Sequence, residues 1–137
     1  MLYLIAAIVI AGFAGSVTDW LFMGVLFKQD YDRYPEIWWP GIREGKEGHA
    51  IMLSTAMGFA MSAALIALCD VAGVSSIKGG AAVALLAWIA GPLGVCVMNG
   101  LFIKFAPRIT FAHATGYLVR LLIAGVAAGI ALPLAGV

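Results

Sequence analysis

Five polar side chains occur in stretches of the 137-residue sequence that are otherwise apolar, and they are the first candidates for chemistry. Asp19 and Arg120 are charged, and the others are Asn99, His113 and Tyr117. An ionised side chain at the centre of a membrane span costs about 2.5–3.5 kcal/mol on insertion scales, so such residues generally pair or mark a functional site. A carboxylate and a guanidinium together could hold an ion or a small solute, and a histidine beside them could relay protons near neutral pH.

The composition places these residues in a lipid bilayer. Hydrophobic residues make up 64% of the chain and charged residues 11%, with a mean hydropathy of +1.04, whereas a soluble domain carries about 25% charged residues. The formal net charge of +1 gives no basic field that would attract nucleic acid. The sequence therefore predicts an integral membrane protein whose first partner is the bilayer.

The gaps between charged residues predict four transmembrane helices. Residues 1–18, 48–69 and 79–103 contain no Asp, Glu, Lys or Arg, and Arg120 is the only such residue after Ile109. About 20 apolar residues cross a hydrocarbon core as a helix, so we expect helices at about 2–26, 49–71, 80–104 and 111–133. They should form an all-α antiparallel bundle in a single domain over residues 1–137. Pro92 should kink the third helix, either as a structural feature or as a hinge beside a cavity.

The distribution of Lys and Arg predicts how the bundle lies in the membrane. Lys78 is the only basic residue expected on one side, and six are expected on the other: Lys28, Arg33, Arg43, Lys46, Lys104 and Arg108. The positive-inside rule places the side with six in the cytoplasm and both termini outside. In the 28–48 loop, charged residues such as the acidic Glu44 alternate with four aromatic residues: Tyr31, Tyr34, Trp38 and Trp39. We expect that loop to lie on the cytoplasmic interface, as an anchor or as a gate.

The depths of the two buried charges predict that they meet. Asp19 precedes Lys28 by nine residues and Arg120 follows Arg108 by twelve, which gives depths of roughly 13 and 18 Å at 1.5 Å per residue. We therefore predict an Asp19–Arg120 ion pair, which could bind an ion or solute or could only fix the order of the helices.

The other three polar residues fall on the same side of the bilayer. Asn99, His113 and Tyr117 could share with the ion pair one polar pocket that opens toward the cytoplasm. The alternatives are that Asn99 only joins helices by a hydrogen bond and that His113 contacts lipid headgroups.

Small residues at helical spacing predict where the helices touch, because membrane helices associate through close packing of such residues. Gly12 and Gly15 share one face of the first helix with Asp19. On the last helix, Gly116 shares a face with Arg120, and Gly125-x-x-x-Gly129 lies on a second face. Two such faces on one helix suggest one contact inside the bundle and one between protomers.

The sequence lacks the short motifs that would identify an enzyme, such as H-E-x-x-H, G-x-S-x-G, a P-loop or C-x-x-C. Cys69 and Cys96 fall at different depths, so we expect neither a redox pair nor a metal site, and no cofactor. The balance favours a protein that is not an enzyme.

Two segments carry a resemblance to a known family. The first helix ends Asp19-Trp20-Leu21-Phe22-Met23-Gly24-Val25-Leu26-Phe27-Lys28, and the last begins His113-Ala114-Thr115-Gly116-Tyr117-Leu118-Val119. Together they resemble a family of small bacterial four-helix membrane proteins of unknown function. This sequence departs from the family pattern at Thr115, which separates Ala114 from Gly116, and in its acidic, Trp-rich loop. The resemblance supports four spans and implies no mechanism. Together with the distribution of Lys and Arg, it predicts a multi-pass protein of the cell inner membrane with both termini periplasmic.

Three functions are compatible with these features. The first is a homo-oligomeric transporter or channel for an ion or small solute that uses Asp19 and Arg120, with Pro92 as a hinge. The second is a structural or accessory subunit of a larger membrane complex, attached through the small-residue faces of the last helix. The third is a membrane enzyme acting on a lipid or a quinone, which rests only on the polar groups near the interface.

Overall fold

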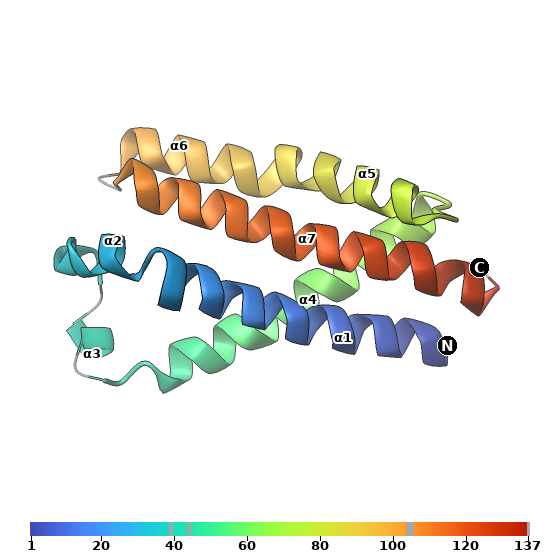
Figure 1. The fold of residues 1–137 in the computed structure, drawn as a ribbon, viewed down its shortest axis with the longest axis horizontal. Helices are drawn as coiled ribbons and strands as arrows, with labels where there is room; N and C mark the ends of the chain where they lie inside the picture. The colour runs from blue at the N-terminus through green and yellow to red at the C-terminus, as the bar shows by residue number, and fades with distance from the viewer. Residues whose placement is uncertain (39, 44, 104–105, 137) are drawn as a thin grey trace.

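The computed structural model describes residues 1–38, 40–43, 45–103 and 106–136, and within these ranges it contains helices and no strand (Figure 1). Four helical segments are long and apolar enough to cross a membrane: Leu2–Leu26, Gly48–Val71, Ile77–Phe102 and Pro107–Ala135. This confirms the predicted all-α bundle of four transmembrane helices. Trp39, Glu44 and Lys104, which entered the sequence predictions, lie outside the described residues.

Two of the four segments contain a π-helix. The first comprises α1 (Leu2–Asp19) and the π-helix η1 (Trp20–Leu26). The third comprises α5 (Ile77–Trp88), the π-helix η3 (Ile89–Leu93) and α6 (Gly94–Phe102). Pro92 lies inside η3, so the helix departs from α geometry where its missing N–H predicted a distortion. The other two segments are the continuous helices α4 (Gly48–Val71) and α7 (Pro107–Ala135).

The third and fourth segments begin earlier than the charge pattern predicted, because their first turns are set by capping and not by hydrophobicity. Ser76 caps α5, its Oγ accepting a hydrogen bond from the Gly79 N–H at 3.2 Å. Pro107 occupies the first turn of α7, where a missing N–H costs nothing. Arg108 is thus part of the helix, with its side chain 74% exposed.

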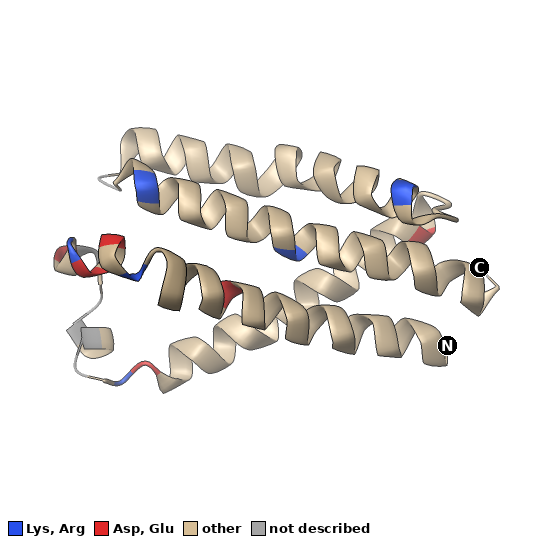
Figure 2. Ribbon diagram, in the orientation of Figure 1, with Lys and Arg blue, Asp and Glu red and all other residues tan. Residues whose placement is uncertain are grey.

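The connection between α1 and α4 consists of short helices. It contains α2 (Lys28–Asp32), the 3₁₀ turn η2 (Pro35–Ile37) and α3 (Pro40–Arg43). Figure 2 shows that charged residues gather at this end of the bundle, opposite the end that holds both chain termini. Lys78 lies in the first turn of α5, at the end where the termini lie (Figure 1). Lys78 and the basic residues of the charged loop, which the topology prediction assigned to opposite sides of the membrane, therefore lie at opposite ends of the bundle.

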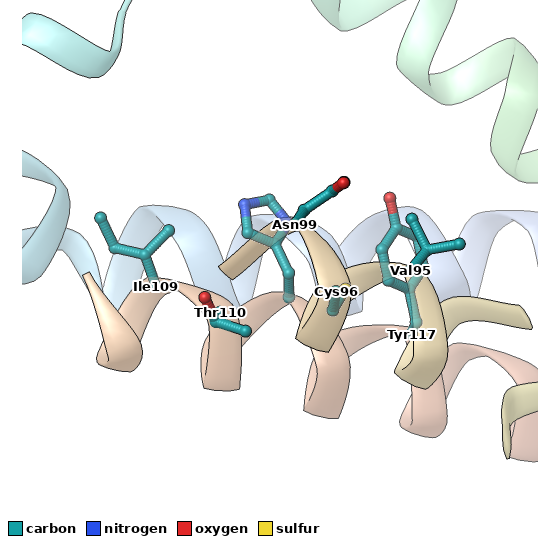
Figure 3. A pocket seen from close by; sticks show the side chains of 7 residues that line it. Val95, Cys96, Asn99, Ile109, Thr110 and Tyr117 are labelled. Atoms are coloured by element: carbon teal, nitrogen blue, oxygen red, sulfur yellow. The ribbon is translucent and has the colours of Figure 1, made fainter. Parts of the chain in front are cut away.

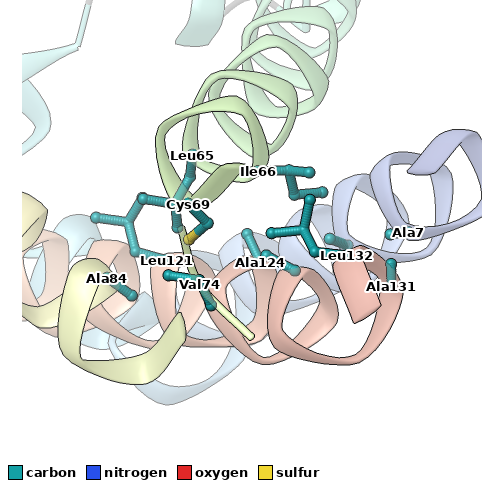
Figure 4. Packing of buried hydrophobic residues seen from close by; sticks show 12 residues of the cluster. Ala7, Leu65, Ile66, Cys69, Val74, Ala84, Leu121, Ala124, Ala131 and Leu132 are labelled. Atoms are coloured by element: carbon teal, nitrogen blue, oxygen red, sulfur yellow. The ribbon is translucent and has the colours of Figure 1, made fainter. Parts of the chain in front are cut away.

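Helix α7 is the central element of the bundle. It packs against α1, α4 and α5, and Figure 1 shows it between α1 and the α5–α6 segment. The apolar core lies toward the end of the bundle that holds the termini and consists mainly of alanine and leucine around Cys69 (Figure 4). In contrast, α6 contains no buried residue. The bundle is therefore tightly packed at one end and looser at the end that carries the charged loop.

The second small-residue face of α7 is filled within the chain. A Cβ at Gly125 would overlap the carbonyl oxygen of Gly80, and one at Gly129 would overlap that of Ser76, so α5 lies directly on the Gly125-x-x-x-Gly129 face. The Gly125-x-x-x-Gly129 face therefore makes a contact inside the bundle, and a contact between protomers stays a prediction.

This backbone contact generates a stability prediction. We expect Gly125→Ala to lower the free energy of unfolding by about 1–3 kcal/mol, the usual cost of overpacking, because the new methyl group meets backbone atoms that cannot rotate away. Thermal unfolding in detergent, followed by circular dichroism, measures the change. Gly91→Ala is the matched control, since a Cβ there meets nothing within 4 Å. Equal stability of the two variants would contradict the close approach of α5 and α7.

Candidate functional site

The predicted ion pair is present at the middle of the bundle. Arg120 Nη1 donates a hydrogen bond to Asp19 Oδ2 at 2.6 Å, joining α7 to the end of α1. The side chain of Arg120 is 3% exposed and that of Asp19 is 23% exposed. Arg120 lies near the middle of α7, and Asp19 is the last residue of α1, where the segment continues as η1. The guanidinium is thus enclosed, while the carboxylate keeps part of its surface open.

Two glycines create the space that the guanidinium occupies. A Cβ at Gly15 of α1 would come within 2.5 Å of Arg120 Nε, and a Cβ at Gly58 of α4 would overlap Nη2. Of these two glycines, Gly15 belongs to the small-residue face that the sequence predicts on the first helix. Their role is to admit a long cationic side chain between three helices.

The guanidinium is incompletely paired. Within the described part of the chain, Arg120 Nε and Nη2 are buried and have no hydrogen-bond partner. A buried donor without a partner costs about 1–3 kcal/mol, so the arrangement depends strongly on the one bond that Nη1 makes. Asp19 is the acidic side chain that balances this charge.

A second polar cluster links the loop to α7. Tyr31 of α2 is 5% exposed, and its hydroxyl lies 2.9 Å from His113 Nε2. The rings of His113 and Tyr117 stack at 6.4 Å between centroids, and Tyr31 contacts Trp38 at 5.4 Å. Burial raises the pKa of the Tyr31 phenol to about 12, and the nearby Tyr117 and Cys96 add to this shift. The position of Tyr31 in the aromatic loop predicted only a place at the membrane interface and did not predict its contact with His113.

A cavity of about 210 Å³ between α6 and α7 brings three of the predicted site residues together (Figure 3). Asn99, His113 and Tyr117 line it with Val95, Cys96, Ile109 and Thr110. Figure 3 shows the Asn99 amide and the Tyr117 hydroxyl pointing to the same side. Three of the five predicted residues therefore line one cavity, and their role as a binding site stays a prediction. Asn99 itself is exposed.

Asp19 lines a different cavity, of about 390 Å³, between α1 and α4. Ser16, Ser54 and Thr55 add hydroxyl groups to its wall, and Trp38 and Glu47 line it at the level of the loop. The structure therefore divides the single predicted pocket into two cavities, one beside the ion pair and one beside His113. Pro92 lines neither of these two cavities, and its role as a hinge stays a prediction.

The described residues contain no group of three or more His, Cys, Asp or Glu side chains that could hold a metal ion. Cys69 and Cys96 are free thiols, one buried in the core and the other beside the α6–α7 cavity. The side chains that line the two cavities offer charge, hydroxyl groups and aromatic rings.

These features define a four-span membrane protein with a buried ion pair next to a polar cavity. A family model described as a protein of unknown function, DUF1761, matches residues 6–129, and the chain belongs to this family. This agrees with the resemblance noted in the sequence. Comparison with curated proteins gives no match, and comparison with solved structures gives none either.

The ion pair generates a prediction about coupled substitutions. We expect Asp19→Asn to lower the free energy of unfolding by about 3 kcal/mol or more, because it leaves an enclosed guanidinium unpaired. The double variant Asp19→Asn, Arg120→Gln should be more stable than Asp19→Asn alone, since it leaves no buried charge. Unfolding in detergent by increasing denaturant measures both.

The pair Asp30–Arg108 provides the matched control for this experiment. Its atoms lie 3.5 Å apart, and Asp30 is buried while Arg108 is 74% exposed. Asp30→Asn therefore leaves the remaining guanidinium in contact with solvent and should cost less than Asp19→Asn. A double variant no more stable than Asp19→Asn would show that the two side chains do not stabilise each other.

Proposed function

We propose that this protein is a small transporter or channel of the cell inner membrane that carries an ion or small solute past the Asp19–Arg120 pair. The proposal rests on the carboxylate of Asp19 inside the span, which contacts Arg120 and also borders a cavity. Oδ2 of Asp19 accepts the bond from Arg120, while the residue forms part of the wall of the α1–α4 cavity. A carboxylate accepts more than one hydrogen bond, so Asp19 keeps capacity for a solute.

The position of the cavity supports entry from the side of the charged loop. Its lining runs from Trp38 and Glu47 at the loop to Ser16 and Asp19 inside the span. Figure 1 shows α1 and α4 diverging toward this same end. In the proposed orientation this end is cytoplasmic and the termini are periplasmic, following the excess of basic residues.

A single copy offers only part of a pathway. Beyond Asp19, the half of the bundle that holds the termini is filled by the apolar core (Figure 4). Completing the passage would require a second copy of the chain or a rearrangement of the helices. The π-helix around Pro92 is the place where α5 and α6 could move relative to each other, so we propose a homo-oligomer with Pro92 as its hinge.

Flux measurements test this function. Purified protein in liposomes is exposed to an imposed membrane potential. Proton flux is followed with an internal pH-sensitive dye, and the flux of Na⁺, K⁺ and small organic ions by uptake of the radiolabelled ion. We expect flux above that of empty liposomes, and we expect Asp19→Asn to reduce it at least about tenfold, a change of about 1.4 kcal/mol in the barrier.

Arg108→Gln is the control for the flux experiment, because Arg108 is exposed and lines neither polar cavity. It should retain the flux of the unmodified protein. Flux no greater than that of empty liposomes for every ion in the panel, or equal flux with Asp19→Asn, would contradict the proposed transport.

One observation favours the alternative role as an accessory subunit. Asn99 is exposed on α6, within a membrane-spanning segment that has few buried residues. An amide in lipid gains from a hydrogen bond to another helix, so this face could contact a larger membrane protein.

Native mass spectrometry of the complex, extracted gently from its own membrane, separates the two roles. For a transporter we expect a homo-oligomer with no other chain, whereas a stoichiometric larger partner would support the accessory role. In that second case Asn99→Leu should release the partner. Met98→Leu, which replaces one exposed apolar side chain by another, should not release it. A homo-oligomer unaffected by Asn99→Leu would argue against a partner on α6.

A further inference from the structure

Two neighbouring cavities at the loop end share part of their walls. The first is the α1–α4 cavity that reaches Asp19. The second, of about 400 Å³, lies within the loop and is lined by Tyr31, Asp32, Pro35, Trp38, Ile42 and Glu47. Trp38 and Glu47 belong to both linings. A solute could therefore pass from the loop cavity to Asp19 along the same two side chains.

Aromatic rings line both cavities. Tyr31 and Trp38 meet at 5.4 Å between centroids with their planes inclined by 39°, which forms a corner rather than a flat stack. Trp20, the first residue of η1, lines the deeper cavity and packs against Gly24 one turn later. The face of an aromatic ring attracts cations, and tryptophan does so most strongly.

The ionisable side chains that line these cavities are acidic, apart from the phenol of Tyr31. Asp32 and Glu47 line the loop cavity, and Glu47 and Asp19 line the deeper one. Within the described part of the chain, no Lys, Arg or His belongs to either lining. This is in contrast to the chain as a whole, in which bases slightly outnumber acids.

We propose that these two cavities bind a small organic cation, an ammonium group that carries apolar substituents. This inference rests on the proposed transport function and names its substrate class. The rings of Trp38, Trp20 and Tyr31 would contact the charged head and its substituents. The carboxylates of Asp32 and Glu47, which Arg120 does not neutralise, would balance its charge. A bare metal ion fits less well, because the described residues offer no cluster of ligands.

Binding of choline tests the proposal, and 3,3-dimethylbutan-1-ol, its neutral isostere, provides the matched control ligand. Isothermal titration calorimetry of the protein in a neutral maltoside detergent avoids the choline headgroups of common lipids. We expect choline to bind and the isostere to bind at least about tenfold more weakly, because they differ in charge and hardly in shape.

Substitutions locate the site. Trp38→Leu should weaken choline binding by about three- to thirty-fold, the range that corresponds to one cation–π contact, and Trp38→Phe should weaken it less because a ring remains. Glu47→Gln should also weaken binding. Glu36→Gln, which removes an exposed carboxylate of the same loop that lines neither cavity, should not.

Three outcomes would overturn the inference: no binding of choline, equal binding of its neutral isostere, or equal effects of Glu47→Gln and Glu36→Gln. Because this measurement is made at equilibrium, it is independent of flux. Choline binding without flux would support the cation site and contradict transport. Flux that depends on Asp19 without choline binding would support transport and overturn the assignment of its substrate class.

Discussion

The arginine in the middle of α7 imposes the strongest constraint on this structure, because a guanidinium inside a bilayer needs both a counter-charge and room. Asp19 supplies the charge through a 2.6 Å bond, and Gly15 and Gly58 supply the room by lacking a Cβ. These three residues come from α1 and α4, so burying Arg120 brings both helices against α7. Since a lone charge in a span is costly, helix order and side-chain pairing depend on the same contact. The central position of α7 follows from this.

Stability and the candidate site occupy different halves of the molecule. Toward the termini, α5 meets α7 at backbone distance over Gly80 and Gly125, and alanines fill the remaining space. Toward the loop, α6 contributes no buried residue and α1 continues as a π-helix. Segments with few buried contacts open at the lowest free-energy cost. The cavities lie where the helices are least constrained, so solute entry would not require the core to loosen.

The sequence was sufficient to predict the four spans and the ion pair, because both depend on distance along the chain. Runs without charge mark the helices, and counting residues from Lys28 and Arg108 placed Asp19 and Arg120 at similar depth. The contact of Tyr31 with His113 could not be predicted, since it depends on how α2 folds back onto α7. For the same reason, the sequence could not predict that the polar residues line two separate cavities rather than one pocket. Depth puts polar residues at one level, but only the crossing angles of the helices decide which of them face each other.

The pairing of Arg120 with Asp19 has a consequence for the proposed transport of a cation. An unpaired Asp19 at the inner end of the α1–α4 cavity would hold a cation tightly, whereas a conducting site must bind weakly enough to release. Arg120 lowers the negative potential at Asp19 without entering the lining of the cavity. Glu47, nearer the loop, has no comparable cation among the residues that line the two cavities. A cation would then be attracted most strongly at the entrance and held less strongly at mid-span, which favours passage over trapping.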